Sequence, residues 1–140
     1  MPITTCIFDA YGTLFDVAAA ARRLAAQSGR EDLAACWQQV AADWRLKQLE
    51  YTWLRATAGR HTDFWQVTQD GLDFALEAAQ LTRPDVRTAL LDLYWELEAY
   101  AEVPAMLQAL KAQGLATGIL SNGTPDMLAG AVGSAGIGNV

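Results

Sequence analysis

The sequence predicts an α/β fold, a parallel-sheet core with a helical insertion, and three observations lead to it. A run of β-branched and aromatic residues at 3–8 ends in an aspartate and a glycine-containing turn, which is the pattern of a strand. Residues 17–100 are rich in Ala, Leu, Gln and Trp, with apolar positions at helical spacing. A second short apolar run at 115–120 ends in polar residues. Strands on either side of a helical block indicate a sheet core interrupted by an insertion.

The helical block contains residues that typically begin or end helices. Gly29 and Gly59 are expected to end the first two stretches, because glycine readily adopts the left-handed conformation of a C-cap. Thr62 is the expected N-cap of the third stretch, and Pro84 suits the first position of the fourth. The predicted helices span 17–27, 31–58 as one helix or two, 63–79, and 84–100.

The chain is expected to return to the core after the insertion. Residues 104–113 should form a helix closed by Gly114, followed by the strand at 115–120 and a helix that begins after Thr124. Because ligands of open α/β sheets bind beside the carboxyl ends of the strands, the polar residues after both strands should share a crevice. The predicted domains are a Rossmann-like parallel-sheet core, incomplete with two strands, at 1–15 and 101–140, and an all-helical cap at 16–100.

Composition limits the function classes. The chain of 140 residues has a net charge of −6 and a pI near 4.6, which argues against nucleic acid because phosphate binding requires a basic patch. No apolar run is long enough to cross a bilayer, and the N-terminus lacks the features of a secretory signal. We therefore expect a cytoplasmic protein that binds neither nucleic acid nor membrane, with Cys6 and Cys36 as reduced core residues.

Asp9 is the first candidate functional residue, because it follows the first predicted strand directly. As a structural residue, it would cap the turn through hydrogen bonds to the backbone. As a functional residue, its carboxylate would attack an electrophilic carbon or phosphorus atom, held ionised by the Thr13 hydroxyl and by N–H groups near Gly12. The sequence position alone leaves both interpretations open.

Arg45 is the second candidate. On a helix, Lys47 has Asp43 and Glu50 at ion-pair spacing, whereas the positions three and four residues from Arg45 carry no carboxylate. The Arg45 guanidinium would either extend along the helix to water or bind an anion from elsewhere. Because Arg55 also lacks carboxylates at these spacings, spacing alone does not select Arg45.

Three segments together resemble the signatures of the L-2-haloacid dehalogenases, a family of the haloacid dehalogenase superfamily. They lie at 8–16, 44–55 and 119–128, and the last contains Ser121 and Asn122. Without the resemblance, Ser121 and Asn122 would be interpreted as an ordinary strand-to-loop turn. The resemblance runs through the whole chain in order.

The resemblance implies hydrolysis of short L-2-haloacids to D-2-hydroxy acids and halide, with inversion and an aspartyl ester intermediate. It implies a homodimer and neither a metal nor an organic cofactor. The implied catalytic residues are Asp9, Thr13, Arg45, Ser121 and Asn122. The implied substrate-binding residues are Tyr11, Arg45, Leu49, Phe64, Ser121 and Asn122.

Each catalytic residue has an implied role. Asp9 is the nucleophile and Thr13 positions it, while Ser121 and loop N–H groups hold the substrate carboxylate. Arg45 and Asn122 receive the departing halide. The remaining residues line the apolar part of the pocket.

Tyr11 distinguishes between possible activities. Phosphatases that resemble this family have a second acid two residues after the nucleophile, which protonates the leaving alkoxide and helps to hold Mg²⁺. Tyr11 occupies that position, and a phenol with a pKa of about 10 is a poor substitute. Halide leaves without a proton, so dehalogenation is favoured. Two alternatives stay open: a metal-dependent phosphatase or phosphonatase-like relative, and a non-catalytic helical interaction module.

The family also has a later lysine near the nucleophile and a cluster of Ser, Asn and Asp residues that orients the hydrolytic water. Both would lie beyond Val140. A parallel sheet normally has more than two strands. We therefore expect this chain to be part of a larger protein and to be nearly inactive alone.

Overall fold

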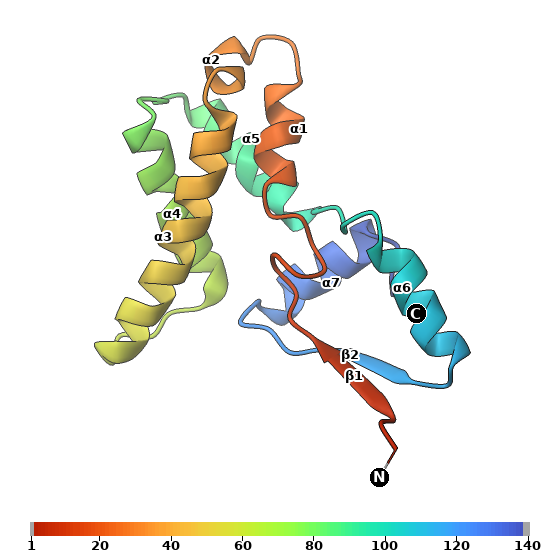
Figure 1. Ribbon diagram of the computed structural model, residues 1–140. Helices are drawn as coiled ribbons and strands as arrows, with labels where there is room; N and C mark the ends of the chain where they lie inside the picture. The colour runs from red at the N-terminus through yellow and green to blue at the C-terminus, as the bar shows by residue number, and fades with distance from the viewer. Residues whose placement is uncertain (1, 139–140) are drawn as a thin grey trace. The chain divides into compact units, whose positions relative to one another are not determined.

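The computed structural model describes residues 2–138 as two parallel strands and seven helices (Figure 1). The chain forms two compact units, a first unit up to Asp16 and from Glu96 onward, and a second unit of Val17–Trp95. The first unit contains both strands and two helices, and the second contains five helices. The predicted α/β fold class is confirmed. The role of the helical unit as a cap stays a prediction.

The sheet of the first unit pairs β1, Thr5–Phe8, with β2, Ala116–Ile119, in parallel. Their register aligns Phe8 with Ile119 at the carboxyl ends. Helix α6, Val103–Ala112, precedes β2 in the chain. It forms part of the crossover connection that two parallel strands require. The loops that follow the two strands therefore start at the same edge of the sheet.

The segment after the second unit pairs with the segment after β1. The Asp16 N–H donates to the Glu98 carbonyl at 2.9 Å, and the Tyr100 N–H donates to the Leu14 carbonyl at 3.0 Å. The helix predicted at 84–100 is shorter in the structure, where α5 spans Pro84–Trp95. It ends there because the following residues pair with the segment after β1. The first unit also contains α7, Pro125–Ser134. Its buried core includes Leu14, Phe15, Val103, Leu107, Met127, Ala131 and Ile137.

The second unit contains α1 to α5, and α3 and α4 lie side by side within it (Figure 1). The predicted stretch 31–58 is two helices, separated by a short break after Ala34. Asp63, rather than Thr62, is the N-cap of the following helix, since its carboxylate accepts from the Gln66 N–H at 2.8 Å. The helices span Ala19–Ala25, Glu31–Ala34, Trp37–Thr57, Phe64–Ala78 and Pro84–Trp95.

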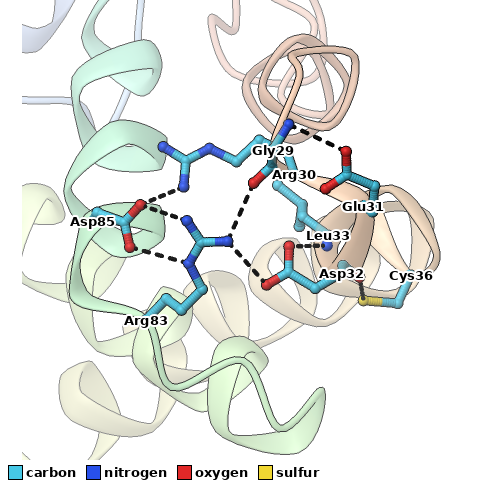
Figure 2. Close-up of polar contacts among 8 residues, drawn as sticks. All are labelled: Gly29, Arg30, Glu31, Asp32, Leu33, Cys36, Arg83 and Asp85. Atoms are coloured by element: carbon cyan, nitrogen blue, oxygen red, sulfur yellow. Dashed lines mark hydrogen bonds and ion pairs between the residues drawn. The ribbon is translucent and has the colours of Figure 1, made fainter.

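A network of ion pairs ties the short α2 segment to the start of α5 (Figure 2). Asp85 accepts from Arg83 at 2.9 Å and from Arg30, and Arg83 also contacts Asp32 and the Gly29 carbonyl. The Arg83 and Arg30 guanidinium groups hold the pKa of Asp85 well below its usual range. These two arginines therefore have structural partners.

Gly71 allows α3 and α4 to approach closely. A Cβ at this position would lie 3.0 Å from the Gln48 nitrogen and 3.2 Å from the Trp44 carbonyl oxygen, both backbone atoms of α3. We expect Gly71→Ala to lower the free energy of unfolding by about 1–3 kcal/mol, because the helices must move apart. Urea denaturation of the chain measures this change.

The matched control is Gly133→Ala in α7, where a Cβ would meet no atom within 4 Å. This variant should be unchanged or more stable by about 0.5–1 kcal/mol, because alanine favours the helix. A Gly71→Ala variant as stable as the unmodified chain would contradict the described packing.

Both cysteines are free thiols, as predicted, but each is half-buried rather than fully within a core. Burial, and secondarily the charge of Asp32, raises the pKa of the Cys36 thiol. Within residues 2–138, no helix has both the length and the apolar character required to span a membrane.

Candidate active site

The loop after β1 holds Asp9 and Thr13 together. The Thr13 hydroxyl donates to Asp9 Oδ2 at 3.0 Å, and both residues are exposed. The turn itself is closed by the Ala10 carbonyl, which accepts from the backbone N–H groups of Leu14 and Phe15 at 2.9 and 3.0 Å. The backbone thus closes the turn, while a hydroxyl holds the carboxylate of Asp9. The nucleophilic role of Asp9 stays a prediction.

Gly12 makes this loop possible. Its φ of 90° lies in the region that side-chain-bearing residues rarely adopt, and its N–H donates to the Phe15 carbonyl at 2.9 Å. The tight turn buries the neighbouring Tyr11, which is 2% exposed. The Tyr11 ring packs at a tilt against Phe15, with centroids 6.0 Å apart.

The loop after β2 carries Ser121 and Asn122. Ser121 is half-buried, and its Oγ accepts from the Gly123 N–H at 3.1 Å, so the local turn bond predicted as the structural alternative does form. A serine hydroxyl that accepts one bond still has a proton to donate. Asn122 is exposed. Thr124 caps α7 by accepting from the Met127 N–H at 3.3 Å.

The two loops meet at the carboxyl edge of the sheet. The Leu120 N–H donates to the Phe8 carbonyl at 2.9 Å, which extends the pairing past the last register pair. Gly123 lies against the Tyr11 ring, since a Cβ there would come within 2.7 Å of Tyr11 Cε2. The first unit therefore brings the Asp9 loop and the Ser121 loop together, as expected from the strand ends.

Arg45, Leu49 and Phe64 belong to the second unit. Arg45 and Leu49 are half-buried on α3, and Phe64 is buried at the start of α4. The Arg45 Nη1 donates to Gln48 Oε1 at 2.9 Å. Arg55, which like Arg45 has no carboxylate at helical spacing, pairs with Asp70 on α4 at 2.5 Å. This pairing distinguishes Arg55 from Arg45 in its contact with Gln48. Lys47 pairs with Glu50, as the spacing predicted.

The sequence reasoning missed a buried polar group in the second unit. Gln48, Thr68 and Tyr94 come from α3, α4 and α5 and are almost fully buried. The amide of Gln48 donates to the Thr68 hydroxyl at 2.7 Å and to the Tyr94 hydroxyl at 3.0 Å. Gln48 lies three residues after Arg45, at the spacing where side chains of one helix can touch. A search for carboxylate partners of Arg45 does not detect an amide partner.

Burial raises the pKa of Tyr94 to about 12, against smaller lowering contributions from Gln48 and Arg45. Tyr94 is therefore a neutral phenol at ordinary pH. Among residues 2–138, no three or more His, Cys, Asp and Glu side chains gather in a way that could hold a metal ion. The metal-free reaction implied by the resemblance stays a prediction.

Comparison with known proteins identifies relatives along nearly the whole chain. The sequence profile of the haloacid dehalogenase-like hydrolases matches residues 3–139. (S)-2-haloacid dehalogenase 1 from Pseudomonas sp. (strain CBS-3) is 48% identical over 132 residues, which cover 94% of this chain and 56% of the relative. The (S)-2-haloacid dehalogenase from Xanthobacter autotrophicus is 42% identical over 139 residues, which cover 96% of this chain and 51% of the relative.

Solved structures of dehalogenases are also similar to this chain. A dehalogenase crystal structure superposes with a TM-score of 0.88 at 38% identity, covering 96% of this chain and 58% of that chain. The L-2-haloacid dehalogenase from Xanthobacter autotrophicus, with chloropropionic acid covalently bound, gives a TM-score of 0.81 at 37% identity, covering 99% and 54%. The chain spans about half the length of the curated relatives that it matches.

Proposed function

The chain belongs to the haloacid dehalogenase-like hydrolases, and from this premise we propose that the complete protein is an (S)-2-haloacid dehalogenase. Its substrates are short L-2-haloacids, and its products are D-2-hydroxy acids and halide. Four relatives that bear this name are 39–48% identical to this chain. Because this chain covers only 54–56% of their length, the proposed activity is that of the complete protein.

The observation that carries this proposal is the chemistry at the end of β1. An exposed carboxylate, Asp9, accepts a hydrogen bond from Thr13. Two residues after Asp9, a buried tyrosine takes the place of an acid. When a phosphate ester is cleaved, the leaving alkoxide requires a proton donor near that position, whereas halide, the anion of a strong acid, leaves unprotonated. Asp9 with Tyr11 therefore suits displacement of halide from carbon.

The first step is a displacement at carbon. An Asp9 carboxylate oxygen attacks C2 of the haloacid from the side opposite the halogen. A carbon–oxygen ester bond forms, the carbon–halogen bond breaks, and the halide leaves with the bonding electron pair. The attack from the opposite side inverts C2, which accounts for an L substrate and a D product.

The second step returns Asp9 to its starting state. Water attacks the carbonyl carbon of the ester, and the acyl carbon–oxygen bond breaks. The hydroxy acid leaves with the oxygen that Asp9 supplied, and one proton passes to solvent. The sum is haloacid plus water giving hydroxy acid, halide and a proton, so atoms and charge balance.

The other predicted residues take supporting roles in this proposal. Arg45 and Asn122 stabilise the halide as its charge develops, the kind of preorganised electrostatic effect that lowers a barrier most. The Ser121 hydroxyl and nearby N–H groups bind the substrate carboxylate. Tyr11, Leu49 and Phe64 line the apolar part of the pocket. The homodimer, the cytoplasmic location and the helical cap expected from the sequence stay predictions.

The hydrogen bond from Thr13 to Asp9 should matter for the rate. In Thr13→Val the carboxylate loses the group that holds its orientation, so we expect kcat to fall about tenfold, the scale of a lost bond to a charged group. Because Thr13 is exposed, the unfolding midpoint should stay nearly constant. Steady-state halide release measures the effect.

Thr88→Val is the matched control. Thr88 is an exposed threonine whose hydroxyl bonds locally to the Pro84 carbonyl on α5, and it has no role in the proposal. Its kcat should equal that of the unmodified protein. Equal rates for Thr13→Val and Thr88→Val would remove Thr13 from the proposed mechanism.

Stereochemistry and metal dependence test the proposed function directly. We expect the complete protein to release chloride from L-2-chloropropionate, not from the D isomer, at the same rate with and without a chelator. Release of phosphate from phosphomonoesters that stops in chelator would instead support the phosphatase alternative. Absence of both activities, with folding intact, would support the interaction module.

A further inference from the structure

Gln48 is a buried amide one helical turn after Arg45 on α3. Its side chain is 1% exposed, and its Oε1 accepts from Arg45 Nη1 at 2.9 Å. We propose that Gln48 is a positioning residue, which holds the Arg45 guanidinium in the orientation that receives the departing halide. This role rests on the proposed function and adds to it a residue that does not touch the substrate.

The partners of Gln48 fix which way its amide points. A guanidinium only donates hydrogen bonds, so the atom that faces Arg45 must be the amide oxygen. The amide nitrogen then faces Thr68, whose hydroxyl proton is already donated to the Phe64 carbonyl at 2.7 Å. Thr68 must therefore accept from Gln48. Reversing the amide would place donors against Arg45, so a single orientation satisfies every partner.

Three helices hold this amide in place. Thr68 on α4 and Tyr94 on α5 both accept from the Gln48 amide nitrogen. The Trp44 indole donates to the Thr68 carbonyl at 2.7 Å, and its ring packs against Tyr94 with centroids 4.9 Å apart. At Gly71 the backbone of α4 also comes close to the Gln48 nitrogen. Gln48 thus has little freedom to turn away from Arg45.

The contact between Arg45 and Gln48 is partly buried in the second unit. The void beside it has no room for a water molecule, and it is lined by Val17, Ala41, Trp44, Arg45, Gln48 and Tyr94. Hydrogen bonds are stronger where water is excluded, because the local dielectric constant is lower. This bond can therefore limit rotation of the guanidinium more than an exposed bond would.

A neutral partner suits an arginine that must attract an anion. The amide of Gln48 orients the guanidinium without adding a negative charge beside it. Arg55, on the same helix, instead pairs with the carboxylate of Asp70, which offsets its charge. Tyr94 also stays neutral at ordinary pH because of its burial. The Gln48 network thus orients Arg45 through a neutral amide and contributes no negative charge of its own.

Gln48→Met tests this role in the complete protein, because methionine has a similar length but its sulfur is a much weaker acceptor than the amide oxygen. We expect the single-turnover rate of halide release from L-2-chloropropionate to fall about tenfold to a hundredfold, the range for one lost bond to a charged group. The rate with the bromo substrate should fall less, since bromide is a better leaving group. A general loss of stability would lower both rates equally.

The matched control is Gln66→Met on α4. Gln66 is exposed and bonds to Asp70, outside the Gln48 network. Its chloro-to-bromo rate ratio should match that of the unmodified protein. An unchanged ratio in Gln48→Met would overturn the positioning role.

Nuclear magnetic resonance of the Arg45 guanidinium separates this role from the proposed function. Its Nη signals, identified by their loss in Arg45→Lys, should show slow rotation in the unmodified protein and fast rotation in Gln48→Met. Unchanged rotation would overturn the inference even if the enzyme is a dehalogenase. If the unmodified protein releases no halide, the proposed function fails, and the rotation rate alone then decides whether Gln48 holds Arg45.

Discussion

Asp9→Asn should abolish halide release from L-2-chloropropionate, lowering kcat by at least about 1,000-fold, as expected when a covalent nucleophile is lost. The asparagine amide is neutral and cannot form the ester at a useful rate. Its shape is close to that of aspartate, and Thr13 can still donate to the amide oxygen. Because residue 9 is exposed, the fold should be retained. A halide electrode measures the rate, and the unfolding midpoint verifies the fold.

The control for this experiment is Asp92→Asn. Asp92 is an exposed acid on α5. The Asp92→Asn variant therefore removes the same charge from the protein and leaves the proposed nucleophile unchanged. Its kcat should be unchanged. An Asp9→Asn variant that keeps more than a tenth of the activity would contradict the nucleophilic role.

Arg45→Lys should give the second largest effect. Lysine keeps the positive charge but cannot present the planar group of donors that arginine does, and it changes the contact with Gln48. We expect the single-turnover rate of chloride release to fall about 100-fold, the scale found when one preorganised donor is lost. The rate of bromide release should fall less, because bromide needs less stabilisation as it leaves.

Arg55→Lys is the matched control on the same helix. Arg55 is bound to Asp70, its side chain is 40% exposed, and lysine can keep this partly exposed ion pair. Both halide-release rates should stay unchanged. Equal losses for the chloro and bromo substrates in Arg45→Lys would contradict a contact with the leaving group.

Local signals in the sequence were sufficient for most of the fold. Apolar periodicity located both strands and the helical regions, and Thr124 with Pro125 marked the start of α7 as observed. The ends were less accurate where tertiary contacts decide them. Helix α5 stops at Trp95 because the next residues pair with the segment after β1, and no residue near position 95 indicates that pairing. The break after Ala34 likewise lacks Gly or Pro.

The candidate site was predictable where two parallel strands end at the same edge of the sheet, and where neighbours in sequence become neighbours in space. The bond from Thr13 to Asp9 joins residues four positions apart, so the loop sequence was sufficient to expect it. The network around Gln48 joins residues 20 and 46 positions apart. Such contacts depend on how three helices pack, which periodicity does not specify. A polar residue on the buried face of a helix, such as Gln48, is the sequence feature that can indicate such a network.

The origin of the product oxygen tests the nucleophilic role of Asp9 most directly. A single turnover of L-2-chloropropionate, with enzyme in excess and in water labelled with the heavy oxygen isotope, should give an unlabelled D-2-hydroxy acid. The label should appear in the peptide that contains Asp9, because water attacks the ester carbonyl carbon. A labelled hydroxy acid with unlabelled Asp9 would show that water attacks C2 itself and would contradict the ester mechanism.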